Sequence, residues 1–297
     1  MAVRRSDLYL PANNEHMIQK APSLGADIIT LDMEDSVPPA EKANARELVK
    51  KYIGDLNKTG SEAWVRINAW DTDLTLADLD AIVLPGLDGI TLPKCSGLAD
   101  VRRIDDEITR LEKLRGLPVG KIKMAILIET ALGVFSVDQA AGGSSRLTTI
   151  IFGAVDYTRD MRVTRTDKAD EQVYARAKIG VAARTYGLVA EDAPFPNYSD
   201  VQAFEDNCRS GAQLGFEGRQ IINPRQIPIA HKVYSPAPER IEWAKEITKV
   251  FEEEGIAKGS ASVGWKGSMI DIPVYRDGLN ILARQAEIEA KEASRVK

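Results

Sequence analysis

Histidine and cysteine are scarce in this 297-residue sequence, and their scarcity narrows the chemistry it can perform. His16 and His231 are the only histidines, so a zinc site of two or three imidazoles is nearly excluded. No GxSxG motif occurs, and no histidine is well placed to activate a serine or cysteine nucleophile, which disfavours covalent acyl transfer. Cys95 and Cys208 lie far apart and match no metal or redox spacing, as is typical of a protein in a reducing cytoplasm.

Long apolar runs and an excess of positive charge are also missing. The first residues, MAVRRSDLYLPANN, lack the apolar core of a signal peptide, and no stretch approaches the roughly 20 apolar residues that span a bilayer. A formal net charge of −5 gives no general attraction to nucleic acid or to anionic membranes. We therefore expect a soluble, cytoplasmic protein without nucleic-acid or membrane partners.

What is present is a series of short apolar segments separated by longer segments with helical spacing. Because the apolar residues are nearly continuous within each segment, they predict parallel strands that are buried on both faces. The predicted strands are Leu8–Leu10, Asp27–Leu31, Ala63–Ile67, Gly89–Leu92, Lys123–Ile128, Thr148–Phe152, Leu188–Glu191 and Arg219–Ile222. Helices are predicted at Glu41–Ile53, Leu98–Arg115 and Tyr174–Tyr186. Eight strands with helical crossovers, and no glycine-rich nucleotide motif after the first, favour an α/β fold of the (β/α)8 TIM-barrel type over an open doubly wound sheet.

About 70 residues follow the last predicted strand. We expect a catalytic barrel domain over residues 1–224 and a C-terminal extension over residues 225–297. The extension is predicted to contain a helix near Glu239–Glu253, a flexible Gly/Ser-rich stretch at Gly259–Gly267 and a charged helix that runs to Lys297. A helical extension of this length could serve as a lid or as a contact between subunits.

Charged side chains follow most of the predicted strands, where a TIM barrel has its active-site face. Charges that converge there are costly to bury unless they are paired, metal-bound or catalytic. The residues concerned are Asp32, Glu34, Asp35, Arg66, Lys94, Glu129 and Asp156. Any one of them could be a rim salt bridge, but six of the eight strand ends carry polar residues.

The residue types at these strand ends favour a hard metal ion. Glu129 and Asp156 offer oxygen donors for Mg2+, whose remaining positions would be filled by water and by an α-keto or α-hydroxy acid. Arg66 could bind the carboxylate of that acid with its planar guanidinium. Lys94 could form a Schiff base with a carbonyl substrate, although a pairing with the acids at 32–35 is the stronger expectation.

The order of segments along the chain resembles the HpcH/HpaI aldolase–citrate lyase superfamily, in particular citrate lyase β-subunit-like proteins and malyl-CoA or citramalyl-CoA lyases. The resemblance spans nearly the whole chain, and the combination of segments is specific although no single segment is. The segments are RRSDLYLPANNEHMIQKA, GADIITLDMEDSVPPAEKANAR, WVRIN, GITLPK, ILIETALGV, FGAVDYTRD, GFEGRQIINPRQI and GSMIDIPV.

The resemblance implies specific roles for several positions. Glu129 and Asp156 would bind Mg2+, with Glu129 also at the substrate, and Arg66 would bind the keto-acid carboxylate. Glu34 and Asp35 would lie near the water ligands of the metal. The GxMID segment implies that a catalytic Asp271 is supplied by a neighbouring subunit of a homo-oligomer, commonly a trimer.

The sequence departs from the family pattern at three positions. Arg219 and Asn223 stand where members usually carry Lys and His, and Val155 stands where many carry an acid. Because asparagine cannot titrate near neutral pH, any acid–base task of that histidine is in doubt. These differences leave the proposed metal ligands in place and indicate a changed substrate pocket or acyl group.

The resulting functional hypothesis is a Mg2+-dependent lyase that cleaves or forms a carbon–carbon bond in a short 3-hydroxyacyl-CoA. Malyl-, methylmalyl- and citramalyl-CoA are candidate substrates, and a keto acid with acetyl- or propionyl-CoA would be the products. Three alternatives stay open: a citrate lyase β subunit that acts on an acyl-carrier-protein thioester, a non-catalytic CoA-binding member, and a class II aldolase. The acyl group, stereochemistry and direction are not determined by the sequence.

Overall fold

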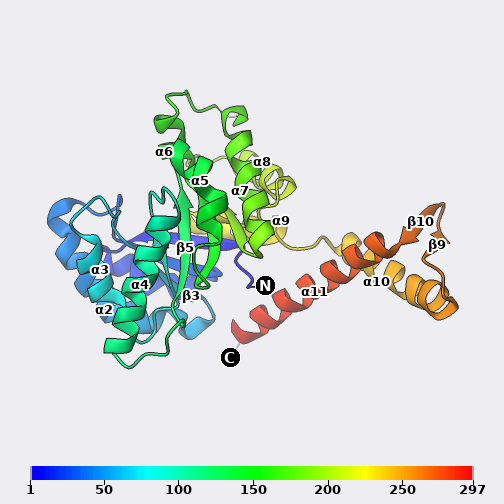
Figure 1. The fold of residues 1–297 in the computed structure, drawn as a ribbon, viewed down its shortest axis with the longest axis horizontal. Helices are drawn as coiled ribbons and strands as arrows, with labels where there is room; N and C mark the ends of the chain where they lie inside the picture. The colour runs from blue at the N-terminus through cyan, green and yellow to red at the C-terminus, as the bar shows by residue number, and fades with distance from the viewer. Residues whose placement is uncertain (1, 167, 296–297) are drawn as a thin grey trace.

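The computed structural model describes residues 2–166 and 168–295, in which eight parallel strands form a closed barrel in chain order (Figure 1). The barrel closes because β1 pairs with β8 as well as with β2. The strands are β1 (Ser6–Pro11), β2 (Ile28–Asp32), β3 (Glu62–Arg66), β4 (Gly89–Leu92), β5 (Lys123–Ile128), β6 (Leu147–Phe152), β7 (Val189–Asp192) and β8 (Gly218–Ile221). The prediction of a (β/α)8 barrel is confirmed, and the eight observed strands overlap the eight predicted ones.

A ring of helices covers the outside of the barrel. The apolar residues of α4 recur every three or four positions, at Val101, Ile104, Ile108 and Leu111, and all four are buried against the barrel. The helices of the ring are α1 (Glu15–Lys20), α2 (Lys42–Leu56), α3 (Thr75–Ile82), α4 (Leu98–Leu114), α5 (Ala131–Ala141), α6 (Ala154–Asp160), α7 (Val173–Tyr186), α8 (Val201–Gln213) and α9 (Ile227–Val233).

The ring extends beyond the predicted domain boundary at residue 224. Helix α9 packs against β1, β8 and α8, so the last helix of the barrel lies within the segment that the sequence assigned to the extension. The chain then leaves the barrel at the segment that precedes α10 (Pro238–Val250).

A projecting arm follows, formed by α10, a two-stranded hairpin and the first half of α11 (Ile272–Arg295) (Figure 1). The arm has a small hydrophobic core of its own, in which Ile247 and Phe251 pack against Ile270 of the hairpin. The predicted helix near 239–253 is observed as α10 and a π-helical turn at Phe251–Gly255. The predicted final helix is observed as far as Arg295, and residues 296–297 lie outside the described residues.

Part of the Gly/Ser-rich stretch at Gly259–Gly267, which the sequence predicts to be flexible, has regular secondary structure. Residues Ser262–Trp265 form β9, which pairs with β10 (Ser268–Asp271) in an antiparallel hairpin. The turn between the strands has Lys266 at φ 45° and Gly267 at φ 78°. A tight type I′ hairpin turn requires a positive φ at both of its central residues, and Gly267 adopts the second of these angles without a steric cost.

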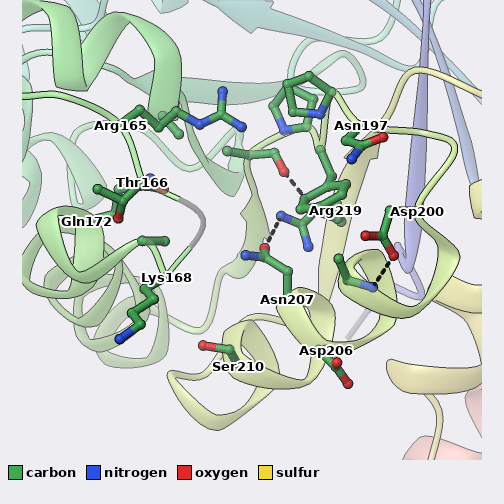
Figure 2. Close-up of a pocket in the computed structure, with 17 residues that line it drawn as sticks. Arg165, Thr166, Lys168, Gln172, Asn197, Asp200, Asp206, Asn207, Ser210 and Arg219 are labelled. Carbon is green, nitrogen blue, oxygen red and sulfur yellow. Dashed lines mark hydrogen bonds between the residues drawn. The ribbon is translucent and has the colours of Figure 1, made fainter.

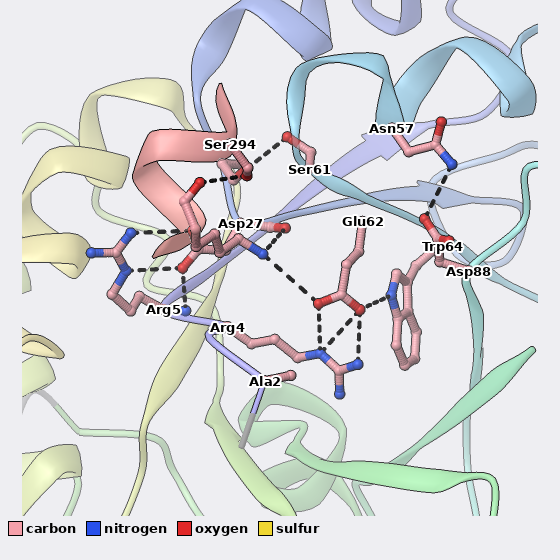
Figure 3. Close-up of polar contacts among 12 residues, drawn as sticks. Ala2, Arg4, Arg5, Asp27, Asn57, Ser61, Glu62, Trp64, Asp88 and Ser294 are labelled. Atoms are coloured by element: carbon pink, nitrogen blue, oxygen red, sulfur yellow. Dashed lines mark hydrogen bonds and ion pairs between the residues drawn. The ribbon is translucent and has the colours of Figure 1, made fainter. Parts of the chain in front are cut away.

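The last turns of α11 return to the N-terminal face of the barrel, opposite to the ends where the active site is expected. Arg295 pairs with Asp27 at 2.7 Å, and Arg5 pairs with Asp27 at 2.9 Å and with Glu292 at 3.0 Å. Figure 3 shows Arg5 beside Asp27, with Arg4 and Glu62 adjacent. Asp27 is completely buried and Glu292 is 54% exposed, so the ion pairs with Asp27 are the shielded ones, and they fix the end of α11.

Among residues 2–166 and 168–295, no helix combines the length and the apolar composition that crossing a membrane requires.

Candidate active site at the C-terminal ends of the strands

Asp32 and Arg66 form a buried ion pair at the ends of β2 and β3. Nε and one terminal nitrogen of Arg66 donate to the two carboxylate oxygens of Asp32, at 2.7 and 2.6 Å. Burial acts to raise the pKa of Asp32, but the charge and hydrogen bonds of Arg66 outweigh it and hold that pKa below its usual value. The pair therefore fixes the plane of the guanidinium, which is the geometry that carboxylate recognition needs.

The loop after β2 brings a second acid to the same guanidinium. The carboxylate of Glu34 lies 3.1 Å from a terminal nitrogen of Arg66 and 2.9 Å from Nζ of Lys94. Lys42 holds this loop in place, since its Nζ donates to the carbonyls of Met33 and Glu34 at 2.7 Å each. The expected pairing of Lys94 with the acids that follow β2 is therefore present.

Lys94 has an unusual backbone conformation, with φ at 50° in the left-handed region. This conformation lets its backbone N–H donate to Oε1 of Glu129 at 2.8 Å while its side chain reaches Glu34. Burial acts to lower the pKa of Lys94, but the hydrogen bond with Glu34 prevails and raises it. A lysine with a raised pKa stays protonated, which argues against the Schiff-base role.

Glu129 and Asp156 follow the neighbouring strands β5 and β6. Burial raises the pKa of Glu129 to about 8, and the negative charges of Glu34 and Asp156 act in the same direction. Asp156 lies in the first turn of α6 and pairs with Arg159 at 2.5 Å. Glu129 can lie this close to the residue after β6 only because that residue is Gly153. A Cβ there would lie 2.5 Å from Cβ of Glu129 and 2.8 Å from its Oε2.

These carboxylates fit a hard divalent cation. Within the described residues there is no group of three or more His, Cys, Asp or Glu side chains that could enclose a metal. Two carboxylates are nevertheless the usual protein contribution to a Mg2+ site, in which substrate and water complete the octahedron. Burial is the largest cause of the raised pKa of Glu129, and the charges of Glu34 and Asp156 add to it, so a bound cation would stabilise the ionised carboxylate.

A cavity of about 530 Å3 opens beside Arg66, Asp32 and Asp35. Two of the five N–H donors of Arg66 donate to Asp32, and one further terminal nitrogen lies 3.1 Å from the Glu34 carboxylate, so part of the guanidinium remains available to a ligand in this cavity. The side chain of Asp35 is 56% exposed and lies 3.9 Å from Nζ of Lys94, so it belongs to the rim of the site rather than to its buried part.

Asp271 does not lie in this cavity. It is the last residue of β10 in the projecting arm, where its Oδ1 accepts a hydrogen bond from the backbone of Val274 at 3.1 Å and caps α11. The structure therefore groups Glu34, Arg66, Lys94 and Glu129 through direct contacts, and it places Asp271 on a separate part of the chain (Figure 1).

Asn223 and Arg219, which stand where family members usually carry His and Lys, both make hydrogen bonds in the structure. Asn223 accepts a hydrogen bond from the backbone of Arg225 at 3.0 Å and caps the short helix that follows β8. Arg219 is buried, donates to Asn207 at 2.6 Å, and lines a second cavity of about 640 Å3 (Figure 2). This second cavity, which shares Pro194 with the first, was not anticipated from the sequence.

Comparison with known proteins places the chain in a family. Residues 5–224 match the model of the HpcH/HpaI aldolase/citrate lyase family. The chain therefore belongs to this family, and its class is that of the carbon–carbon lyases.

Two curated relatives are similar over almost the full length. The citrate lyase subunit beta of Leuconostoc mesenteroides subsp. cremoris is 40% identical over 92% of this chain and 90% of its own length. The mitochondrial citramalyl-CoA lyase of Mus musculus is 32% identical over 97% of this chain and 88% of its own.

Solved structures show the same fold. Protein CitE of Mycobacterium tuberculosis, in complex with magnesium, acetoacetate and coenzyme A, has a TM-score of 0.77 at 27% identity, covering 95% of this chain and 97% of that one. A citrate lyase from Burkholderia xenovorans LB400 has a TM-score of 0.87 at 21% identity, covering 97% of this chain and 93% of that one, which supports the fold.

Proposed function

We propose that the protein is a Mg2+-dependent lyase that cleaves or forms a carbon–carbon bond in a short 3-hydroxyacyl-CoA. The observation that carries this proposal is the chain of contacts that joins Arg66, Glu34, Lys94 and Glu129 at one end of the barrel, with Asp156 following the next strand. Relatives named citramalyl-CoA lyase and L-malyl-CoA/beta-methylmalyl-CoA lyase support the substrate class. The structural relative that contains magnesium, acetoacetate and coenzyme A supports the metal and the thioester.

In the cleavage direction, Arg66 binds the carboxylate of the hydroxyacid part, and Asp32 keeps its guanidinium in the correct plane. Glu129 and Asp156 would hold Mg2+, which supplies Lewis-acid stabilisation of the oxygen that loses its proton. Lys94 orients Glu129 through its backbone N–H. Departure of the hydroxyl proton then releases a keto acid and the enolate of the acyl-CoA.

Asp271 of a neighbouring subunit would protonate the enolate carbon, or deprotonate the acyl-CoA in the reverse direction. The arm that presents it has apolar residues at its tip, with Met269 61% and Ile272 45% exposed. The barrel also exposes apolar side chains on α5, α6 and α7, the helices that follow β5 and β6. They are Leu132, Phe135, Val155, Tyr174 and Val181. We therefore propose that the arm of a second copy covers this surface in a homo-oligomer, with a trimer as the expected state.

The test is incubation of the protein and Mg2+ with malyl-, methylmalyl-, citramalyl- and 3-hydroxy-3-methylglutaryl-CoA, followed by mass spectrometry. Formation of acetyl-CoA or propionyl-CoA together with a keto acid is the expected result. An Arg66→Ala protein is the control for adventitious hydrolysis. Complete silence with all four thioesters would exclude the proposed substrate class.

A second candidate is a citrate lyase β subunit that acts on an acyl-carrier-protein thioester. The 40% identity to the citrate lyase subunit beta of Leuconostoc mesenteroides, against 32% to the mouse citramalyl-CoA lyase, favours it. Turnover of citryl thioester on a carrier protein but not on CoA would identify this function.

A further inference from the structure

The interior of the barrel contains an apolar cluster and a set of buried polar side chains. Alternate residues of each strand face inwards. The apolar cluster consists of Ile28, Trp64, Ala125, Leu127 and Ile151. Polar side chains of β1, β2, β4 and β7 are buried in the barrel as well. They are Asp7, Tyr9, Thr30, Thr91 and Glu191.

Two carboxyl groups face each other among these polar side chains. Asp7 is 1% exposed and Glu191 is 0% exposed, and the two side chains are within hydrogen-bonding reach. Asp7 also accepts a hydrogen bond from the hydroxyl of Thr30 at 2.6 Å. Neither oxygen of Glu191 receives a hydrogen bond from a donor in the described residues. Because two ionised carboxylates would repel each other at this burial, a proton between them is the arrangement that satisfies both.

The charged groups around the pair do not replace that proton. Arg4 is the nearest cation, but its guanidinium is occupied by Glu62, Thr148 and Thr149. Glu62 adds negative charge from β3. Arg66 lies over the ring of Tyr9, and its charge acts on the Tyr9 hydroxyl. Burial raises the pKa of Asp7 to about 7, and burial together with the charge of Asp7 raises the pKa of Glu191 well above its usual value.

Tyr9 links this pair with the active-site cavity. The ring of Tyr9 lines the cavity under Arg66, whose guanidinium lies 5.4 Å from the ring centre. Its hydroxyl is buried, and the charges of Asp7 and Glu191 both act on it.

We propose that Asp7 and Glu191 share one proton and, by way of the Tyr9 hydroxyl, accept the proton that leaves the substrate hydroxyl. This inference rests on the proposed lyase function. The O–H bond of the substrate breaks, and its electron pair becomes part of the new C=O bond of the keto acid. The electrons of the cleaved C–C bond remain on the enolate. The pair changes from one proton to two and returns the second proton to solvent after the keto acid leaves.

Infrared spectroscopy tests the shared proton without any measurement of activity. A buried carboxylic acid gives a C=O band that shifts in D2O and is absent from ionised carboxylates. We expect this band in the wild type at pH 8 with Mg2+ present, and we expect Glu191→Gln to remove it. The amide that this substitution introduces has the same shape as the carboxyl group and can donate to Asp7, so the variant is expected to fold. Glu112→Gln is the matched control, because Glu112 is equally buried but paired with Arg146.

The pH dependence of kcat tests the proton transfer. In the wild type, the pair cannot accept a proton when both groups are protonated, so kcat falls at acidic pH. Asp7→Asn removes the group that accepts the proton, and burial together with its neighbours keeps Glu191 protonated because its pKa lies well above the usual value. We therefore expect kcat of Asp7→Asn at pH 8 to fall by about 100-fold, with KM little changed. In Glu191→Gln the introduced amide can donate to Asp7 as Glu191 does, a hydrogen bond that lowers the pKa of Asp7, so the acidic limb should stay close to that of the wild type. Unchanged kcat in Asp7→Asn would overturn the proton transfer.

The two proposals fail in different ways. Absence of the protonated-carboxyl band in the wild type, or its persistence in both Glu191→Gln and Asp7→Asn, would overturn the shared proton whatever the enzyme's substrate. A wild type that has the band but cleaves no acyl-CoA would overturn the proposed function and the transfer step, and it would leave the pair itself established.

Discussion

The backbone N–H of Lys94 donates to Oε1 of Glu129 at 2.8 Å from a residue whose φ is 50°. A left-handed conformation is costly for a residue with a Cβ, by roughly 1–2 kcal/mol. The surrounding contacts maintain it because Lys94 uses both its backbone and its side chain, the latter at 2.9 Å from Glu34. One strained residue thus links the loop after β2 to the proposed metal ligand on β5.

Substitution of Lys94 separates the role of its ammonium group in activity from the loss of stability caused by its left-handed backbone conformation. Lys94→Gly relieves the left-handed strain and Lys94→Ala keeps it, while both remove the pairing with Glu34. We expect both variants to lose most activity, and we expect the glycine variant to be more stable than the alanine variant by about 1 kcal/mol. Urea unfolding and turnover measurements check this, and equal stabilities would contradict the strain.

Binding of Mg2+ is predicted to weaken as the pH falls below about 8. The raised pKa of Glu129 means that a proton competes with the cation, so affinity should fall by up to about tenfold between pH 7 and pH 6. In the metal-free protein, the raised pKa favours folding at low pH, and this contribution is lost as the pH rises through about 8. Mg2+ should therefore raise Tm more at pH 9 than at pH 6.

The Glu129→Gln protein provides the control for that experiment. It should keep the fold, lose Mg2+-dependent turnover and show little change of Tm with Mg2+ at either pH. Full activity in this variant would remove Glu129 from the metal site.

Gly153→Ala is predicted to displace the Glu129 carboxylate. The added Cβ would lie 2.5 Å from Cβ of Glu129, a distance that requires one of the two segments to move. We expect a loss of about 1–3 kcal/mol of stability and a large loss of Mg2+ affinity, measured by thermal unfolding and calorimetry. Gly54→Ala is the matched control, because a Cβ there has no atom closer than 4.0 Å and residue 54 lies within a helix. Normal Mg2+ binding by Gly153→Ala would contradict the geometry.

Mixed oligomers test whether Asp271 acts on a neighbouring subunit. Asp271→Ala should lower the rate by at least about 100-fold, the lower end for a general acid–base. When chains with Asp271→Ala are combined with chains with Arg66→Ala, some sites contain both intact residues, so activity should reappear. No recovery in oligomers verified by native mass spectrometry would place Asp271 outside the shared site.

Asp27 is predicted to control acid stability at the closed face of the barrel. Burial acts to raise its pKa, but the contacts with Arg5 and its cationic neighbours lower it to about 2. This contribution to stability is therefore present at neutral pH and is lost as the pH falls from about 4 through about 2. Asp27→Asn should cost about 3–5 kcal/mol at pH 7 in chemical unfolding, and much less at pH 2.5. An equal loss of unfolding free energy at pH 7 and at pH 2.5 would contradict the ion pairing of Asp27.

The barrel could be predicted from the sequence because its strands are short, apolar and separated by helical periodicity. The strand ends could be predicted for the same reason, so Arg66, Glu129 and Asp156 were located before their contacts were known. Asp32 was recognised as a strand-end acid, but its bidentate contact with Arg66 was not predicted, since pairing across β2 and β3 depends on the strand register.

Other features depend on contacts between distant segments. The hairpin at 262–271 has too few residues for a clear strand pattern, and its glycines and serines suggested a flexible loop. The facing of Asp7 and Glu191 requires the closed barrel, because β1 and β7 lie near opposite ends of the barrel sequence and meet only across the interior. Asp271 could be placed in the arm, but no pattern in one chain indicates which subunit it serves.

Asp27 is paired by Arg5 near the start of the chain and by Arg295 near its end. A protein is synthesised from its N-terminus, so Arg5 emerges with Asp27, whereas Arg295 emerges only after all eight strands of the barrel. Until α11 has been synthesised, the N-terminal face of the nascent barrel lacks the helix that shields this carboxylate. The N-terminal face of the barrel is therefore completed by a segment that is made after the barrel itself.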